Sequence, residues 1–527
     1  MKIQTFSENE WLYPDTVITK PNNAVKLESA RGANISFQIL TDKEITKDEK
    51  VSIKWEAPSN IDLKFTVYQL LPARVEENSA PKVYTTLDYD SVSHFVTRRA
   101  PFYVYDVTRN IDDGCLKPGR AAFYVRVFVP ENCQLGEYEL KLNIAFSDCS
   151  FNVDVLLKVY KAAVPALGSS VFNMINWLNL KSIAKVHNLE HGSAAFWEAV
   201  QRYLENQIDM RNNHIMLPSG IPVRDETGRV VDFNFDDAIR LGNMALKAGF
   251  KYIYGGFVAR FKEWNQKEHY LLWDRDVSVV TFEAYRQLKL YFEKLWDIVN
   301  KNNWKNHYMQ CLVDEPQFPN SEHYRILSGI CRKFMPGVKI NDPVESTDLE
   351  GAVDIWVVKQ SVYEKHISKY QALQSLGEEI WIYTCGFPAG YVMNRVMDLP
   401  LLVSRLPMWM CYLYDAKGFL HWGYNVYNEK PFESTCYFHG DPEKLFPPGN
   451  AFVVYPGNNE PWYSVRGHLQ RAGAEDFELL HQLGLRNKEK AREIISRICT
   501  SFEDYKSSAE DFAAVRSELL QELEKYN

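Results

Sequence analysis

Eight short apolar runs after Pro165 constrain the fold of this 527-residue chain more than any other feature. Runs that are hydrophobic on both faces are typical of parallel strands covered on both sides. Parallel neighbours need crossover connections, which are usually helices. Eight such strands alternating with helices predict a (β/α)8 barrel of the TIM type. The predicted strands are Val171–Trp177, His214–Leu217, Tyr252–Gly256, His307–Asp314, Val338–Asn341, Asp354–Lys359, Ile380–Cys385 and Phe419–Tyr424.

Apolar residues recur at helical spacing between most of these strands. One interval departs from the pattern, because Asp342–Val353 leaves little room for a helix between the fifth and sixth strands. We therefore expect an irregular barrel at that point. The predicted helices are Ala194–Met210, Phe235–Ala248, Phe282–Asn300, Ser321–Phe334, Ser361–Leu376 and Leu399–Tyr414.

The chain before Pro165 alternates apolar and polar residues with period two, as in Tyr138-Glu-Leu-Lys-Leu-Asn-Ile. Such alternation indicates antiparallel strands with one buried face, and several of them predict a β-sandwich. The last strand is expected to run into a linker at Pro165. The fold class is thus a multidomain α and β protein: an amino-terminal antiparallel β-sandwich (residues 1–165), a (β/α)8 barrel (166–460) and carboxyl-terminal helices packing on it (461–527). In those helices we expect Arg466 and Arg471 to be structural, pairing with Glu475 or Asp476.

Composition narrows the classes of partner. The formal net charge is −8 and no run of Lys or Arg is present, so we expect no nucleic-acid partner. No stretch is apolar enough to span a bilayer, and the amino terminus lacks a signal core, so we expect a cytoplasmic protein without membrane contact. Nine cysteines without a Cys-x-x-Cys pair argue against a disulfide framework or zinc site, and we expect no metal or cofactor. These features predict no particular oligomeric state.

The fourth apolar run ends in two adjacent acids, Asp314 and Glu315, followed by Pro316. Because active sites of such barrels lie at the carboxyl ends of the strands, we expect both acids at the barrel mouth. The proline is expected to hold Glu315 in an extended conformation. Two carboxyls so close raise the cost of a second charge, which makes one of them a candidate proton donor near neutral pH.

Adjacent acids do not fit the usual retaining glycosidase, whose two carboxyls stand about 5–5.5 Å apart. They fit better a substrate that supplies its own nucleophile through a 2-acetamido group. One acid then orients the acetamido N–H and its neighbour protonates the leaving oxygen.

Other polar and aromatic residues at the predicted strand ends make a rim of the kind that a carbohydrate site would have. Those considered for substrate contact are Trp177, Arg260, Asp342, Tyr383, Trp422, Tyr424 and Asn425. Lys359 and Gln360 also stand at a strand end, and His421 alternates with Trp422, so the two should face opposite sides.

Segments spread along the chain resemble glycoside hydrolase family 123 and its uncharacterised relatives. They include Phe123-Tyr-Val-Arg-Val-Phe-Val-Pro, Ala248-Gly-Phe-Lys-Tyr-Ile, Val313-Asp-Glu-Pro, Trp381-Ile-Tyr-Thr-Cys, Ser404-Arg-Leu-Pro-Met-Trp, Gly418-Phe-Leu-His-Trp-Gly-Tyr-Asn, Val454-Tyr-Pro-Gly and Arg471-Ala-Gly-Ala-Glu-Asp-Phe-Glu. Founding members of that family are β-N-acetylgalactosaminidases with a β-sandwich and a (β/α)8 barrel.

The resemblance implies an exo-acting, retaining hydrolase of a β-linked 2-acetamido sugar, with a glycan or glycoconjugate as its partner. It implies that Asp314 orients the acetamido group and that Glu315 is the general acid and base. It makes Tyr383 a candidate donor to the acetamido carbonyl and Trp422 a candidate stacking platform, with Tyr424 or Asn425 near a sugar hydroxyl. Galacto- and gluco-configured sugars both stay open.

Two other readings stay open. A hydrolase on the same fold could act on a sugar without the acetamido group, with Asp342 or Glu345 as nucleophile. A non-catalytic carbohydrate-binding protein could also retain the barrel.

Overall fold

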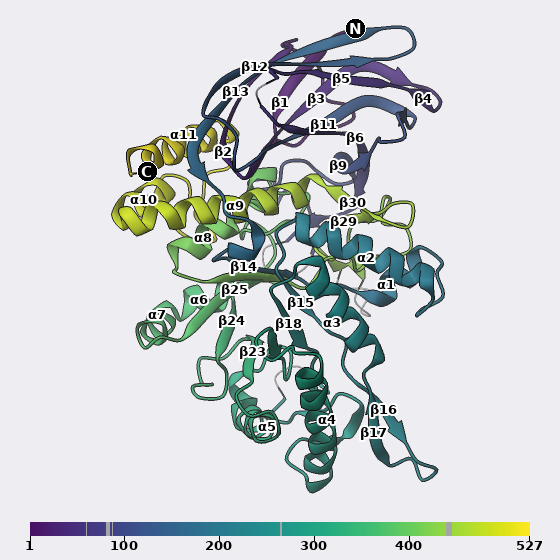
Figure 1. The fold of residues 1–527 in the computed structure, drawn as a ribbon, viewed down its shortest axis with the longest axis vertical. Helices are drawn as coiled ribbons and strands as arrows, with labels where there is room; N and C mark the ends of the chain where they lie inside the picture. The colour runs from purple at the N-terminus through teal and green to yellow at the C-terminus, as the bar shows by residue number, and fades with distance from the viewer. Residues whose placement is uncertain (60, 81–84, 87, 264–265, 439–444, 527) are drawn as a thin grey trace.

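The computed structural model describes residues 1–59, 61–80, 85–86, 88–263, 266–438 and 445–526 (Figure 1). Its centre is an eight-stranded parallel sheet in the order β14-β26-β25-β24-β23-β22-β18-β15. The ends of the sheet meet where the Asn213 N–H donates to the Met174 carbonyl at 3.0 Å, which leaves the barrel nearly closed. All eight predicted strands are confirmed: β14 Asn173–Asn176, β15 His214–Met216, β18 Tyr252–Gly255, β22 Tyr308–Gln310, β23 Lys339–Val344, β24 Ile355–Lys359, β25 Glu379–Thr384 and β26 Gly418–His421.

Helices follow most of these strands, and none lies between β23 and β24 among the residues described there, as the short interval predicts. Two predicted helices are each divided in the structure, 361–376 into α6 and α7 and 399–414 into η3 and α8. The helices around the barrel are α1 Leu180–Val186, α2 Ala194–Asp209, α3 Asp236–Ala248, α4 Phe282–Lys301, α5 Ser321–Phe334, α6 Gln360–Lys365, α7 Ile367–Ser375 and α8 Pro407–Leu413, with the short 3-10 turns η1 Leu167–Ser169, η2 Phe318–Asn320 and η3 Leu401–Ser404.

Local sequence accounts for several helix ends. The Ser193 hydroxyl accepts the Phe196 N–H at the start of α2, and the Thr281 hydroxyl accepts the Ala284 N–H at the start of α4. These caps satisfy backbone donors that the helix leaves free. Helix α3 ends at Gly249, whose φ of 110° lies in the left-handed region that glycine adopts without strain.

The amino-terminal third forms two sheets, which confirms the predicted antiparallel strands. One exception is β2, which pairs with β13 in parallel. A single hydrophobic cluster draws on both sheets, with Phe37 and Val125 from one and Leu142 and Val155 from the other. The first sheet contains β1 Ile3–Ser7, β3 Ala33–Ile45, β11 Gly119–Val129, β6 Lys64–Val75, β9 Phe102–Asn110, β30 Pro461–Ser464 and β29 Val454–Pro456; the second contains β2 Ala24–Arg31, β13 Ser150–Ala163, β12 Gly136–Ala145 and β5 Ser52–Glu56.

Short strand pairs lie outside these sheets, and the β16–β17 hairpin projects from the body of the molecule (Figure 1). They are β4 Glu49–Lys50 with β10 Cys115–Leu116, β7 Asn78–Ser79 with β8 Thr85–Thr86, β16 Ile221–Arg224 with β17 Val230–Asn234, β27 Tyr437–Phe438 with β28 Leu445–Phe446, and the three-stranded set β19 Ala259–Arg260, β20 Tyr270–Leu271 and β21 Asp274–Ser278.

The carboxyl-terminal part links the sheets to the barrel. Helix α9 (Val465–Arg486) runs between them, followed by α10 (Lys488–Ser496) and α11 (Ala509–Tyr526) (Figure 1). Arg471 pairs with Glu475 at 3.2 Å, as predicted, whereas Arg466 pairs with Asp106 of β9 at 2.8 Å. Because β29 and β30 extend the first amino-terminal sheet, the chain returns to that sheet after the barrel. The proposed division at residues 165 and 460 stays a prediction.

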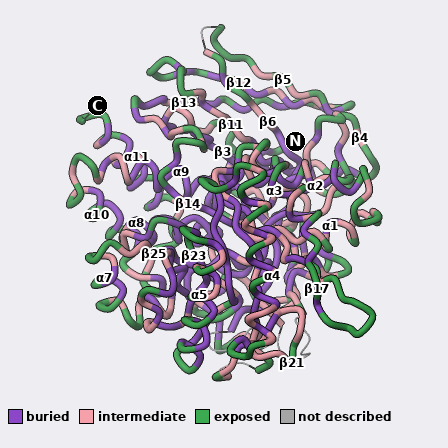
Figure 2. Tube along the Cα trace, turned by 60° about the horizontal axis from the view of Figure 1, so that its bottom comes forward, coloured by how far each residue is buried: buried purple, intermediate pink, exposed green. Residues whose placement is uncertain are grey.

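Buried residues occupy the interior of the molecule and exposed residues its periphery (Figure 2). In the described part of the chain, no helix combines the length and the apolar character that crossing a membrane requires.

Candidate active site

Alternation along the barrel strands decides which side chains reach the barrel mouth. Ile355 and Val357 of β24 belong to the interior cluster, so Lys359, two residues further on, continues on the same face. Because the strands are parallel, their carboxyl ends lie at one end of the barrel. The same spacing aims three other side chains inward at that end: Tyr383 on β25, Trp422 after β26 and Trp177 after β14.

The two acids reach the mouth through an irregular turn. The ladder of β22 ends at Gln310, and Asp314 and Glu315 follow outside it. Glu315 has a φ of 50°, so the prediction of an extended residue before Pro316 is wrong. A left-handed residue breaks the alternation that would send consecutive side chains to opposite faces. As a result, Asp314 and Glu315 line the same cavity.

This cavity has a volume of about 670 Å³ and opens at the carboxyl ends of the strands. Its wall combines carboxylates, one lysine and several aromatic rings. The lining residues are Trp177, Asp314, Glu315, Pro343, Glu345, Lys359, Tyr383, Cys385, Gly386, Phe387, Leu420, Trp422 and Phe446.

Glu315 contacts one hydrogen-bond donor from β25 and one cation from β24. The Tyr383 hydroxyl donates to its Oε1, and the Lys359 ammonium lies 3.7 Å from the same atom. Lys359 also forms an ion pair with Glu345. Burial, followed by the charge of Glu315, raises the pKa of Tyr383 well above its usual value, so the hydroxyl keeps its proton and acts as a donor.

Asp314 is open to the cavity, yet the surrounding wall limits its hydration. This desolvation and the adjacent charge of Glu315 raise its pKa, while Lys359 acts in the opposite direction. The raised pKa favours the neutral form of the Asp314 carboxyl.

Hydrogen bonds hold the two tryptophan rings that wall the cavity. The Trp177 indole N–H donates to the Tyr254 hydroxyl at 3.0 Å, and that of Trp422 donates to Asn450 Oδ1 at 3.1 Å. Aromatic faces fixed in this way can pack against the C–H faces of a sugar ring.

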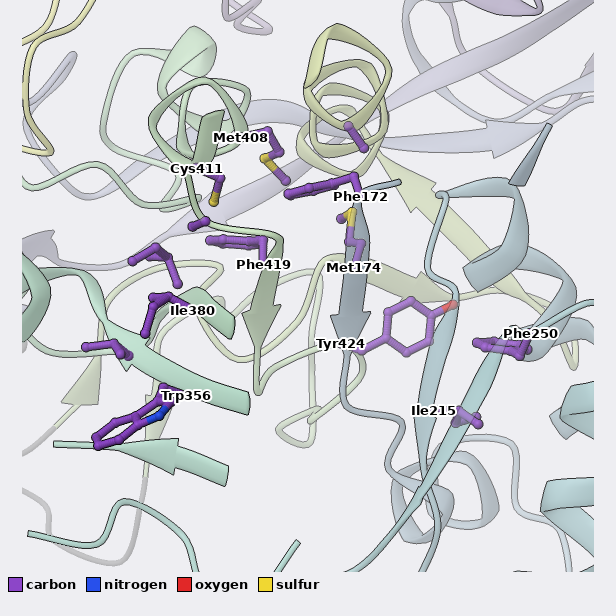
Figure 3. Packing of buried hydrophobic residues seen from close by; sticks show 14 of the residues in the cluster. Phe172, Met174, Ile215, Phe250, Trp356, Ile380, Met408, Cys411, Phe419 and Tyr424 are labelled. Carbon is purple, nitrogen blue, oxygen red and sulfur yellow. The ribbon is translucent and has the colours of Figure 1, made fainter. Parts of the chain in front are cut away.

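Two further residues considered for substrate contact lie behind the cavity wall. Asp342 is fully buried, because it alternates with Pro343 and faces the layer between β23 and α5. Its carboxylate accepts the Leu312 N–H at 2.9 Å and the Tyr324 hydroxyl at 2.7 Å. Tyr424 packs in the hydrophobic core (Figure 3) and donates to Asn206 Oδ1 at 2.7 Å. Neither side chain lines the cavity, so the positions of Asp342 and Tyr424 do not support direct contact with substrate.

The remaining two also support the fold around the site. Asn425 is buried and exchanges hydrogen bonds with the backbone of Asn179, at 2.8 Å from the Asn179 N–H and 3.0 Å to its carbonyl. These bonds tie the segment after β26 to the one after β14. Arg260 lies on β19, where its Nε donates to the Phe261 carbonyl at 3.2 Å, and it does not line the cavity.

The cavity also contains residues outside the predicted set of substrate contacts, among them Lys359, which was noted at a strand end, and Glu345, which was named as an alternative nucleophile. Lys359 follows from the inward spacing of Ile355 and Val357, a signal present in the sequence. Glu345 follows in the same way from Pro343. Phe446 comes from β28, far along the chain, and no strand-end pattern indicates it.

No group of three or more His, Cys, Asp or Glu side chains arranged to hold a metal ion occurs in the described ranges.

The chain is similar to known glycoside hydrolases in sequence profile and in fold. The family model described as "Glycoside hydrolase 123, catalytic domain" matches residues 177–483, more than half of the chain, including both acids. A family 123 glycoside hydrolase from Clostridium perfringens, solved in work on glycolipid glycan hydrolysis, matches with a TM-score of 0.75 at 13% identity over 100% of this chain and 97% of that chain. At this identity the match shows a shared fold.

Two other structures are similar at lower TM-scores. A GH10 xylanase with a bacterial Ig-like domain from termite gut has a TM-score of 0.36 at 12% identity, covering 86% of this chain and 99% of that one. An endo-β-1,4-mannanase from Thermotoga petrophila has a TM-score of 0.37 at 12% identity, covering 60% and 78%. No curated protein matches the chain by sequence.

Proposed function

Because this chain belongs to glycoside hydrolase family 123, we propose that it cleaves a terminal β-linked 2-acetamido sugar, N-acetylgalactosamine-like, by substrate-assisted retaining catalysis. The observation that carries this proposal is that consecutive acids, Asp314 and Glu315, open into one cavity. Substrate-assisted hydrolases are a recognised exception to the scheme of two separated carboxyls. The substrate is a glycan or glycoconjugate.

In the first step, the acetamido carbonyl oxygen forms a bond to the anomeric carbon while the bond to the leaving oxygen breaks. Glu315 gives its proton to that oxygen, and Asp314 accepts the acetamido N–H and offsets the positive charge of the cyclic intermediate. In the second step, water attacks the anomeric carbon, the bond from that carbon to the acetamido oxygen breaks, and the proton that water loses returns to Glu315. Inversion occurs twice, so configuration is retained.

The Tyr383 hydroxyl donates to Glu315 in the structure. We propose that substrate draws this hydroxyl to the acetamido carbonyl, where it orients the nucleophile. Positive charge on the acetamido nitrogen also favours the ionised form of Asp314, which offsets the raised pKa of that carboxyl. The indole rings of Trp177 and Trp422 are the proposed platforms for the sugar. In the amino-terminal third, we propose that the two sheets form a sandwich that supports the barrel.

Glu345 motivates a second candidate function. It is a third carboxylate in the cavity and could serve as the nucleophile toward a sugar without an acetamido group. Its pairing with Lys359 lowers the availability of its charge for attack.

A panel of p-nitrophenyl β-glycosides with and without the 2-acetamido group tests the proposal. We expect turnover of the acetamido sugars only, competitive inhibition by a thiazoline mimic of the cyclic intermediate, and losses of at least about 100-fold in kcat for Asp314→Asn and Glu315→Gln. Turnover of 2-hydroxy glycosides that ignores the thiazoline and depends on Glu345 would establish the second candidate instead.

A further inference from the structure

Side chains at the ends of β24 and β25 contact Glu315, and Glu345, which follows β23, pairs with one of them. Lys359 at the end of β24 places its ammonium 3.7 Å from Glu315 Oε1 and in an ion pair with Glu345. The same ammonium lies 5.9 Å from the centre of the Tyr383 ring. One cation is therefore shared between the proposed acid and base and a second carboxylate.

The shared cation is poorly exposed. The side chain of Lys359 is 9% exposed, and those of Glu315 and Glu345 are each 15% exposed. Water screens charges weakly at such sites, so their interactions are stronger than those of surface pairs.

Glu345 is fixed to the turn that carries the acids. Its backbone N–H donates to the Pro316 carbonyl at 3.1 Å, and Gln317 Nε2 lies 3.5 Å from its Oε2. The segments after β22 and β23 are thereby held together, which keeps the Glu345 carboxylate beside the ammonium.

We propose that Lys359 is a positioning residue that governs how readily Glu315 holds its proton, and that Glu345 limits this effect by pairing with the same ammonium. The proposal rests on the assigned role of Glu315 as acid and base. A nearby cation favours a carboxylate, whereas a general acid must carry its proton when the leaving group departs. Without Glu345, the charge of Lys359 would favour the ionised form of Glu315. The negative charge of Glu345 offsets that effect.

Other titratable side chains also lie beside Glu315 in the cavity. Asp314 precedes it in the same turn, and Tyr383 and Cys385 face it from β25 and the residue after that strand. None of them changes in the variants below, so a change in the behaviour of Glu315 reports on Lys359 and Glu345.

The pH dependence of kcat/KM on a phenyl 2-acetamido glycoside tests the proposal, because this poor leaving group needs the proton of the acid. Glu345→Gln leaves the cation uncompensated, so the alkaline limb should move to lower pH by about one unit. Lys359→Met removes the cation and leaves a carboxylate, so the limb should move to higher pH by about one unit. The double variant should return close to wild type. Damage to the fold would not produce shifts of opposite sign.

Carbon NMR titration of Glu315, in protein labelled at the glutamate carboxyl carbon and assigned with Glu315→Gln, gives a readout that needs no turnover. We expect the titration midpoint to move in the same opposite directions. A chain that turns over no acetamido sugar would defeat the proposed function, while this titration would still decide the role of Lys359. Shifts of the same sign, unmoved midpoints, or a Lys359→Met variant that only raises KM would overturn the proposal.

Discussion

Glu315 combines the carboxyl of the proposed acid and base with a backbone conformation that residues with a Cβ rarely adopt. Its φ of 50° costs a residue with a Cβ roughly 1–2 kcal/mol relative to glycine. Glu315→Gly should therefore melt at a higher temperature than Glu315→Ala, although both lack the carboxyl. Glu322→Gly and Glu322→Ala serve as the control, because Glu322 is exposed in the first turn of α5. At that helical position the alanine variant should be the more stable of the two. Equal melting temperatures for the two Glu315 variants would mean that the left-handed turn is absent in solution.

Asp314 should make stability depend on pH. Its pKa is raised on folding, so the folded chain binds a proton in a range where the unfolded chain has lost it. Stability attributable to this group therefore falls as pH rises above the unfolded pKa of about 3.9. Asp314→Asn has no carboxyl to ionise at this position, so it avoids this decrease in stability. The difference in melting temperature between the variant and wild type should therefore increase from pH 4 upward in thermal scans. A difference that is constant with pH would contradict the raised pKa.

At the scale of elements, the segment after β22 depends on its neighbour β23. Asp342 accepts the Leu312 N–H, for which a regular ladder would supply a backbone carbonyl, and it also accepts the Tyr324 hydroxyl. Asp342→Ala should leave two buried donors unpaired, at about 1–3 kcal/mol each, and displace the acids. We expect a lower melting temperature and a lower kcat. Tyr324→Phe removes one donor and should cost less. If Asp342→Ala matched Tyr324→Phe in both measurements, the carboxylate would not be holding this segment.

Strand and helix patterns predicted the barrel because continuous apolar runs and helical spacing are local signals. The inward positions of Lys359 and Tyr383 were also readable from alternation, since Ile355 and Trp381 fix the parity of their strands. The left-handed conformation of Glu315 could not be predicted from the sequence. The proline after it favours an extended residue, and tertiary packing outweighs that local preference. The burial of Tyr424 was not readable either, because β26 ends at His421 and alternation no longer applies beyond it.

At the scale of the whole molecule, a buried ion pair joins the amino-terminal sheet to α9. Arg466 and Asp106 are both fully buried, and the Tyr455 hydroxyl donates to the same carboxylate at 2.8 Å. Asp106→Ala should destabilise the protein by about 3–5 kcal/mol, because it leaves a buried guanidinium unpaired. Replacing both partners, as in Asp106→Leu with Arg466→Met, should cost less by thermal and chemical denaturation. A double variant less stable than Asp106→Ala would show that the pair itself, rather than the orphaned charge, dominates.

In the proposed mechanism the substrate supplies the nucleophile, Asp314 orients the acetamido group and Glu315 transfers the proton. The most direct measurement is kcat/KM for p-nitrophenyl β-glycosides whose 2-acetamido group carries zero, one, two or three fluorines. Fluorine withdraws electrons from the carbonyl oxygen and makes it a weaker nucleophile. Substrate assistance therefore predicts that kcat/KM falls by at least about tenfold with each fluorine, which corresponds to about 1.4 kcal/mol of activation free energy. A rate that is unchanged across the series would contradict the account and assign the attack to a protein carboxylate.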